Sequence, residues 1–150
     1  EGKFIFSKTE EGKNKMRQYK IKDKYENFEK VIDKLETIMK KDISCDEAYL
    51  DAAIKRFEFT YELTWKLLKA YLEYLGISNI EGSRNTFREA FKAGIIKDSD
   101  LWMNMIDDRN KTSHTYDESA AMEIYNKIKM NYLDILMGLK KEMKDRINNG

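Results

Sequence analysis

The sequence predicts an all-α protein, an antiparallel four-helix bundle with one additional short helix. Proline is absent from the 150 residues, so the chain lacks the residue that most strongly interrupts helices. Charged residues make up 37% and hydrophobic residues 41%, and charged side chains can cover the outer faces of long amphipathic helices. Apolar residues also recur at helical spacing along most of the chain. A chain of this length is expected to form one domain around one core.

Residues 1–23 are predicted to be an N-terminal extension, and residues 24–150 to form the bundle domain. The first 15 residues contain three glycines or asparagines among lysines and glutamates. We expect the extension to be partly disordered or foreign to the native chain, with Met16 as a candidate native start. Its short apolar cluster, Phe4–Phe6, is expected to form a strand or to dock on a neighbour.

The first helix of the bundle is predicted over residues 25–41. Its apolar positions at helical spacing are Phe28, Val31, Ile32, Leu35, Ile38 and Met39. A turn over residues 43–46 follows, and either Ser44 or Asp46 can accept a backbone hydrogen bond as the N-cap of the next helix.

The second helix is predicted over residues 46–75, with Gly76 at its C-terminal cap. It has two apolar stripes, and a helix with so wide an apolar face is usually buried on two sides. Two interpretations remain open. Either this is the central helix of the monomer, or its second side is a dimer interface.

Ser83 is the predicted N-cap of a short helix that Gly94 ends. After a connector, another helix runs from Asp98 or Ser99 through Lys111. The buried stripe of that helix includes Arg109, and a buried arginine is unfavourable unless it is paired. Glu58 and Asp108 are the candidate partners.

A helix break is predicted at Thr112–Thr115, because short polar side chains compete for backbone hydrogen bonds. Asp117 then caps the last helix, over residues 118–147. The predicted core face of that helix consists of Ala121, Ile124, Ile128, Tyr132, Ile135, Leu139 and Met143.

The helix break lies inside the stretch with the most distinctive chemistry. His114 is the single histidine, and it stands five residues after Arg109 and two residues before Tyr116. Arginine presents a planar fork of donors to phosphate oxygens, and histidine exchanges protons near neutrality. On a continuous helix, residues five apart point about 140° from one another. Arg109 and His114 therefore meet one phosphate only if the helix stops between them, or if they face a second copy across a dimer.

These residues resemble the signature of the HEPN superfamily: Arg109, four residues, His114, one residue and Tyr116. The resemblance is strongest to the branch of nucleotidyltransferase substrate-binding proteins. It extends upstream through Arg56–Lys66, Arg88–Gly94, Trp102 and Met105, and it covers about residues 24–146.

The resemblance implies a HEPN-like helical bundle that forms a homodimer and pairs with a minimal nucleotidyltransferase. It implies a toxin that cleaves RNA without a metal, with Arg109 and His114 as catalytic residues and Asn110 in a supporting role. It also implies that the partner, acting as antitoxin, transfers AMP to Tyr116 and silences the nuclease. The alternative that it leaves open is a non-catalytic subunit that presents a substrate to the transferase.

Composition limits the other classes of function. The 28 basic and 27 acidic residues nearly cancel, so no global field attracts nucleic acid and RNA binding should be local. A lone histidine and a lone cysteine cannot assemble a His/Cys zinc site, and we expect no metal or cofactor. Cys45 is the single cysteine, and no apolar run approaches the roughly 20 residues that span a bilayer. We therefore expect a soluble cytoplasmic protein.

Overall fold

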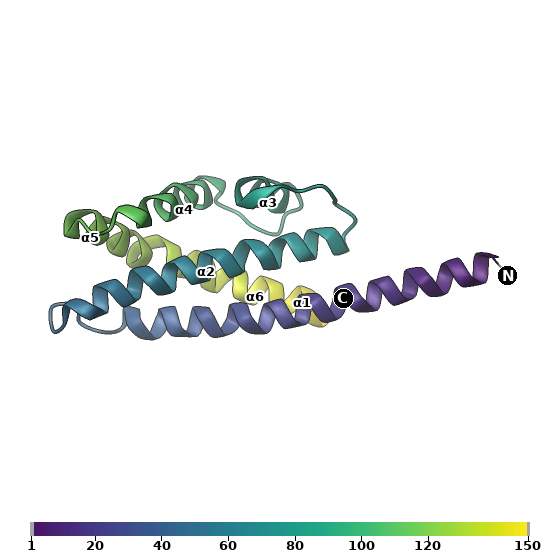
Figure 1. Ribbon diagram of the computed structural model, residues 1–150, viewed down its shortest axis with the longest axis horizontal. Helices are drawn as coiled ribbons and strands as arrows, with labels where there is room; N and C mark the ends of the chain where they lie inside the picture. Colours follow the sequence, from purple (N-terminus) through teal and green to yellow (C-terminus); the bar gives the residue numbers. More distant parts are fainter. Residues whose placement is uncertain (1, 150) are drawn as a thin grey trace.

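The computed structural model describes the backbone of residues 2–149 and the side chains of residues 10–149. The described chain is a bundle of α-helices without strands (Figure 1), which confirms the predicted all-α class. The helices are α1 (Gly2–Met39), α2 (Glu47–Tyr74), α3 (Gly82–Lys92), α4 (Ser99–Lys111), α5 (Glu118–Lys127) and α6 (Leu133–Asn149). No helix among the described residues is both long and apolar enough to cross a membrane.

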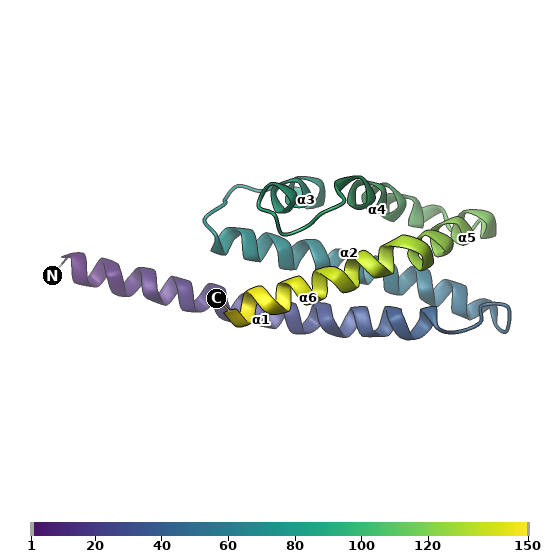
Figure 2. The same cartoon turned by 180° about the vertical axis from the view of Figure 1, so that it is seen from behind.

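Helix α2 lies at the centre of the bundle. α1 runs antiparallel along one side of it, while α3, α4 and α5 cover the other side (Figures 1 and 2). α6 returns across the bundle and packs against α1. Most of both apolar stripes of α2 is therefore buried within the monomer, and of the two interpretations the central-helix one accounts for the pattern.

Helix α1 is longer than the sequence pattern indicates, because it begins at Gly2 instead of near Tyr25. Its first half projects past the end of α6 as an isolated helix (Figures 1 and 2). Lysines and glutamates favour helix without an apolar face, and an ion pair links Lys13 to Glu10 at 4.0 Å. The strand expected for Phe4–Phe6 is wrong, since the backbone there is helical.

Two of the predicted N-caps are confirmed. The Asp46 carboxylate accepts a hydrogen bond from the Ala48 amide at 2.9 Å, and the Asp117 carboxylate accepts one from the Ser119 amide at 3.1 Å. Each carboxylate satisfies one of the amides that have no partner inside the first helical turn. These caps fix where α2 and α5 begin.

The predicted N-cap Ser83 is wrong. α3 begins two residues earlier than that cap implies, with Glu81 at the cap position and no side-chain cap hydrogen bond. The Ser83 hydroxyl instead accepts a hydrogen bond from the Tyr61 hydroxyl at 2.6 Å. The Ser83 hydroxyl, which the local pattern assigns to capping, is therefore engaged in a tertiary contact with α2. Similarly, α4 begins at the predicted position after Asp98, but the Asp98 side chain makes no cap hydrogen bond.

The glycines at the ends of α2 and α3 are confirmed as C-terminal caps. Gly76 has φ +92° and Gly94 has φ +75°, in the left-handed region that side chains with a Cβ rarely adopt. The Ile77 amide donates to the Leu72 carbonyl at 3.0 Å, which is the hydrogen bond of a Schellman motif.

The last predicted helix is interrupted by a π-helical turn, Ile128–Tyr132, between α5 and α6. A π turn contains more residues than an α turn, so it shifts the buried face of the helix after it. Leu136 is fully buried, while the predicted core residue Ile135 is only partly buried. Ile135 still packs against the edge of the core, but the constant α-helical period of the prediction places the most buried position one residue too early.

Candidate active site at the α4–α5 corner

The Arg–His–Tyr stretch forms the corner where α4 ends and α5 begins. α4 stops at Lys111, and Thr112–His114 form a single 3-10 turn. The hydroxyl of Thr112 donates to the Arg109 carbonyl at 2.7 Å, and the hydroxyl of Thr115 donates to the Thr112 carbonyl at 2.9 Å. These side-chain bonds replace helical ones and end the helix between Arg109 and His114, as the sequence predicts.

His114 and Tyr116 lie together on the surface of this corner. Their ring centroids are 6.3 Å apart in an edge-to-face arrangement with an interplanar angle of 81°. His114 is exposed, and Tyr116 is 88% exposed. Both the imidazole and the phenol are therefore accessible to a large partner or substrate.

Arg109 is half-buried beside α2. Its guanidinium lies 3.7 Å from the Glu62 carboxylate and 3.8 Å from the Glu58 carboxylate. Another guanidinium nitrogen donates to the Thr112 hydroxyl at 3.0 Å. Its Nε is buried and has no hydrogen-bond partner among the described residues. The two ion pairs are long, so the guanidinium retains donor capacity for another anion.

One of the two partners predicted for Arg109 is confirmed and the other is wrong. Glu58 lies beside the guanidinium, whereas Asp108 faces the interior of the bundle. Glu62 was missed, although it follows Glu58 by four residues and so shares its helix face. That spacing was the signal in the sequence that could have identified it.

The Asp108 carboxylate is 2% exposed and accepts hydrogen bonds from the Tyr132 hydroxyl and, at 3.2 Å, from the Lys127 ammonium group. Burial, followed by the hydrogen bond to Asp108, raises the pKa of the Tyr132 phenol above its ordinary value. This cluster ties the last turn of α4 to the π-helical segment. Since Arg109 follows Asp108 directly, the cluster also helps to set the position of Arg109.

The structure groups the predicted site residues into two sets. Arg109 is bound to Thr112, and His114 is in contact with Tyr116, but no hydrogen bond joins Arg109 to His114 within residues 2–149. Asn110 is exposed, and its carbonyl accepts a hydrogen bond from the Ser113 hydroxyl at 3.2 Å. No described residues form a cluster of three or more metal-ligating side chains.

A groove of about 540 Å³ runs beside Tyr116, between the α1–α2 turn and α5. Carboxylates of Glu47, Asp51 and Glu118 line it together with Tyr116. Their negative charge opposes the entry of a phosphate from this side. His114 does not line this groove.

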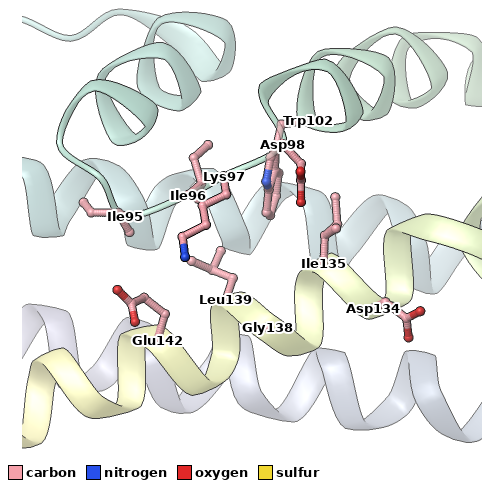
Figure 3. A pocket seen from close by; sticks show the side chains of 10 residues that line it. All are labelled: Ile95, Ile96, Lys97, Asp98, Trp102, Asp134, Ile135, Gly138, Leu139 and Glu142. Carbon is pink, nitrogen blue, oxygen red and sulfur yellow. The ribbon is translucent and has the colours of Figure 1, made fainter.

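A second groove, of about 350 Å³, lies between α6 and the α3–α4 connector. Trp102, Ile135 and Leu139 point toward one another across it (Figure 3). It contains none of the residues of the Arg–His–Tyr stretch, and Trp102 is 2% exposed and belongs to the core.

A helical bundle with an arginine, a histidine and a tyrosine at one helix corner is the arrangement of the HEPN class. Residues 23–145 match the family described as nucleotidyltransferase substrate-binding protein like, and the chain belongs to this family. A Haemophilus influenzae protein described as a probable ribonuclease HepT is 38% identical over 86 residues. That match covers 55% of this chain and 59% of the Haemophilus protein, less than two thirds of its length.

Two solved structures have the same fold. A Thermus thermophilus protein is 32% identical, with a TM-score of 0.65 over 80% of this chain and 98% of that chain. A chain of the toxin–antitoxin pair MntA–HepT is 16% identical, with a TM-score of 0.70 over 83% of this chain and 97% of that chain. At that identity the second likeness shows the fold alone.

Proposed function

We propose that this protein is a toxin of the HEPN class, a metal-independent endoribonuclease that works as a homodimer in the cytoplasm. Its partner is a minimal nucleotidyltransferase that acts as antitoxin. The observation that supports this most directly is the exposure of His114 beside Tyr116 on a corner next to Arg109. The family match and the likeness to a probable ribonuclease HepT support the same class of activity.

The residues of the corner have the chemistry that RNA cleavage needs. A proton must leave the ribose 2′-hydroxyl, another must reach the departing 5′ oxygen, and charge on the phosphorane must be neutralised. His114 serves as base or acid, and Arg109 stabilises the charge. One histidine can occupy one of the two proton-transfer roles at a time, so a second copy supplies the other across a dimer. Asn110 orients the phosphate or the imidazole from the exposed end of α4.

Tyr116 is the proposed acceptor of AMP, which the partner would transfer from ATP to the phenol oxygen with release of pyrophosphate and of the phenol proton. Its hydroxyl belongs to a side chain that is 88% exposed, so another protein can reach it without unfolding the corner. AMP on this phenol would add bulk and negative charge close to His114, since the centroids of the two rings are 6.3 Å apart. That charge would repel an incoming RNA phosphate and silence the nuclease.

A second function is a non-catalytic subunit that presents a substrate to the transferase. Two observations favour it: Arg109 lies between Glu58 and Glu62, and the whole chain has a net charge of +1. In that case Tyr116 and its groove are a docking or acceptor surface, and Arg109 stabilises the fold.

The deciding experiment is the cleavage of total tRNA and mRNA by the purified protein in EDTA, with Arg109→Ala and His114→Ala alongside. We expect products with 2′,3′-cyclic phosphate ends, and a loss of at least about a hundredfold in each variant. Sedimentation of the same samples reports whether each variant is still a folded dimer. A folded wild-type dimer that cleaves no RNA would favour the substrate-presenting subunit.

The modification is tested by intact-mass measurement after incubation with the partner transferase and ATP. We expect one AMP-sized gain in mass, absent from Tyr116→Phe and retained in Tyr19→Phe, which changes another exposed tyrosine. A gain in Tyr116→Phe equal to that of the wild type would place the acceptor elsewhere.

A further inference from the structure

The part of α1 that passes the end of α6 and continues beyond it is strongly basic. Residues 13–24 contain six lysines or arginines and one acidic residue, Asp23. That leaves 22 of the 28 basic residues and 26 of the 27 acidic residues for the rest of the chain. Of these, 20 basic and 23 acidic residues belong to residues 25–150, so the near-neutral total hides a basic helical segment attached to a slightly acidic bundle.

Four of the basic residues of this segment share one face of the helix. Lys13, Arg17, Lys20 and Lys24 follow one another at spacings of four, three and four residues, which places them on one face. Residues 11–20 are all exposed, so the ammonium and guanidinium groups there are open to solvent. Lys13 makes a contact with Glu10 at 4.0 Å, which is too long to neutralise it.

An aromatic side chain stands beside this basic face. Tyr19 is 73% exposed, and Lys15 and Lys22 lie four residues before and three residues after it on the helix. An exposed ring among cations offers a surface on which a nucleic-acid base can stack. By contrast, Met16 and Tyr19 are the two apolar side chains of residues 11–20, so this segment lacks the wide apolar face of membrane-surface helices.

We propose that residues 13–24 of α1, here called the basic arm, bind the phosphate backbone of the RNA substrate outside the cleavage site. This inference rests on the proposed ribonuclease function and adds a second RNA contact to it. The arm supplies the positive charge that the groove at Tyr116 lacks, since that groove is lined by Glu47, Asp51 and Glu118.

The basic arm and the Arg–His–Tyr corner lie at opposite ends of the molecule (Figure 1). From Arg17 to Met39 the helix rises roughly 33 Å, and the groove at Tyr116 lies beyond that point, beside Ile43 and Ser44. An RNA that touches both the arm and the corner of one protomer must be longer than this. The arm therefore selects structured or long RNA over short oligonucleotides.

The test compares Arg17→Glu/Lys20→Glu with Lys30→Glu/Lys34→Glu. The second pair is the matched control, because it makes the same charge change at exposed positions of the same helix within the bundle. Binding of a fluorescein-labelled tRNA in EDTA is measured by anisotropy on the His114→Ala protein, so that cleavage does not interfere. We expect the arm variant to bind at least about tenfold more weakly, with a salt dependence reduced by about two phosphate contacts. The control should stay within about twofold.

Cleavage is then measured with His114 intact, on tRNA and on a tetranucleotide. The arm variant should cleave tRNA about tenfold more slowly and the tetranucleotide at the rate of the control. If no RNA is cleaved even by the wild type, the nuclease proposal fails while the anisotropy comparison still decides the role of the arm.

Three results would overturn the proposal. The first is equal tRNA affinity of the arm variant and the control. The second is an equal loss of cleavage on tRNA and tetranucleotide, since the substitutions would then act through the fold or the active site. The third is unchanged tRNA binding together with lost binding to phosphatidylserine vesicles, which would make the arm a membrane contact.

Discussion

The Tyr132 hydroxyl donates a hydrogen bond to the Asp108 carboxylate in the interior of the bundle. Asp108 belongs to the last turn of α4 and Tyr132 to the π-helical segment, so the bond joins two elements that are 24 residues apart. The Lys127 ammonium group, 3.2 Å away, supplies the opposite charge. A buried carboxylate without such partners is unfavourable, and this cluster therefore holds the corner that carries Arg109.

Replacing Tyr132 by phenylalanine removes one of these partners and leaves the ring in place. We expect a loss of about 1–3 kcal/mol in the free energy of unfolding, because the Asp108 carboxylate stays buried with one donor fewer. This loss is measured by urea unfolding, monitored by circular dichroism. Tyr125→Phe, at another buried tyrosine of the same helical run, is the control. Equal unfolding midpoints for the two variants would show that the bond to Asp108 adds no stability.

The free energy of unfolding should fall in alkaline solution, because two tyrosines of the folded protein have raised pKa values. Burial is the largest cause that raises the pKa of Tyr25, to about 12, and it also raises that of Tyr132. The unfolded chain, in which tyrosine titrates near 10, then loses these protons first, so unfolding becomes easier as pH rises above about 10. The stabilisation is complete below that pH. For Tyr25 it is lost between about pH 10 and about pH 12.

The measurement is the urea midpoint at several values from pH 8 to pH 11.5. Relative to the wild type, Tyr132→Phe should lose stability less steeply above pH 10, by up to about 1.4 kcal/mol per pH unit. Parallel curves for the two proteins would contradict the raised pKa of Tyr132.

Glu58 and Glu62 compete with RNA phosphate for Arg109 in the proposed enzyme. Their carboxylates lie 3.8 and 3.7 Å from the guanidinium. We expect Glu58→Gln/Glu62→Gln to tighten RNA binding by about two- to fivefold, which corresponds to about half to one kcal/mol of lost competition. Glu26→Gln/Glu36→Gln on α1 removes the same charge elsewhere and is the control. Weaker RNA binding in the first variant alone would mean that the two carboxylates position Arg109 instead of competing for it.

Substitution of Gly94 is predicted to destabilise the protein, because its φ of +75° strains any residue with a Cβ. Gly94→Ala should lower the free energy of unfolding by about 1 kcal/mol. Gly138 lies within α6 and has open space where a Cβ would be added, so Gly138→Ala should raise it by up to about 1 kcal/mol. Thermal unfolding of the two variants measures both changes, and a stabilised Gly94→Ala would contradict the predicted strain.

Much of the fold could be predicted from local patterns. Gly76 and Gly94 mark helix ends because positive φ is a property of the single residue, and Asp46 and Asp117 mark starts because capping is local. Ser83 fails as a cap because Tyr61, 22 residues away, takes its hydroxyl. A contact of that range leaves no trace in a local pattern.

The residues of the candidate site come from the family signature, which names Arg109, His114 and Tyr116, and their role stays a prediction. The helix break between them could be predicted from short polar side chains, and the structure has it. The partner set of Arg109 could be predicted only in part. Asp108 and Arg109 are neighbours in sequence but point to opposite environments, and the choice depends on Tyr132 and Lys127 on a distant helix.

The π turn at Ile128–Tyr132 has the effect of one residue inserted into a regular helix. Since the π turn takes up the extra residue, removing a single residue between Lys127 and Tyr132 would restore a regular α-helix and leave α6 facing the same way. Leu136 would then stay in the core, whereas removing two residues would turn it about 100° away. The π turn thus keeps the apolar face of α6 on the core despite the extra residue, and a related chain that is one residue shorter here should have a regular α-helix in its place.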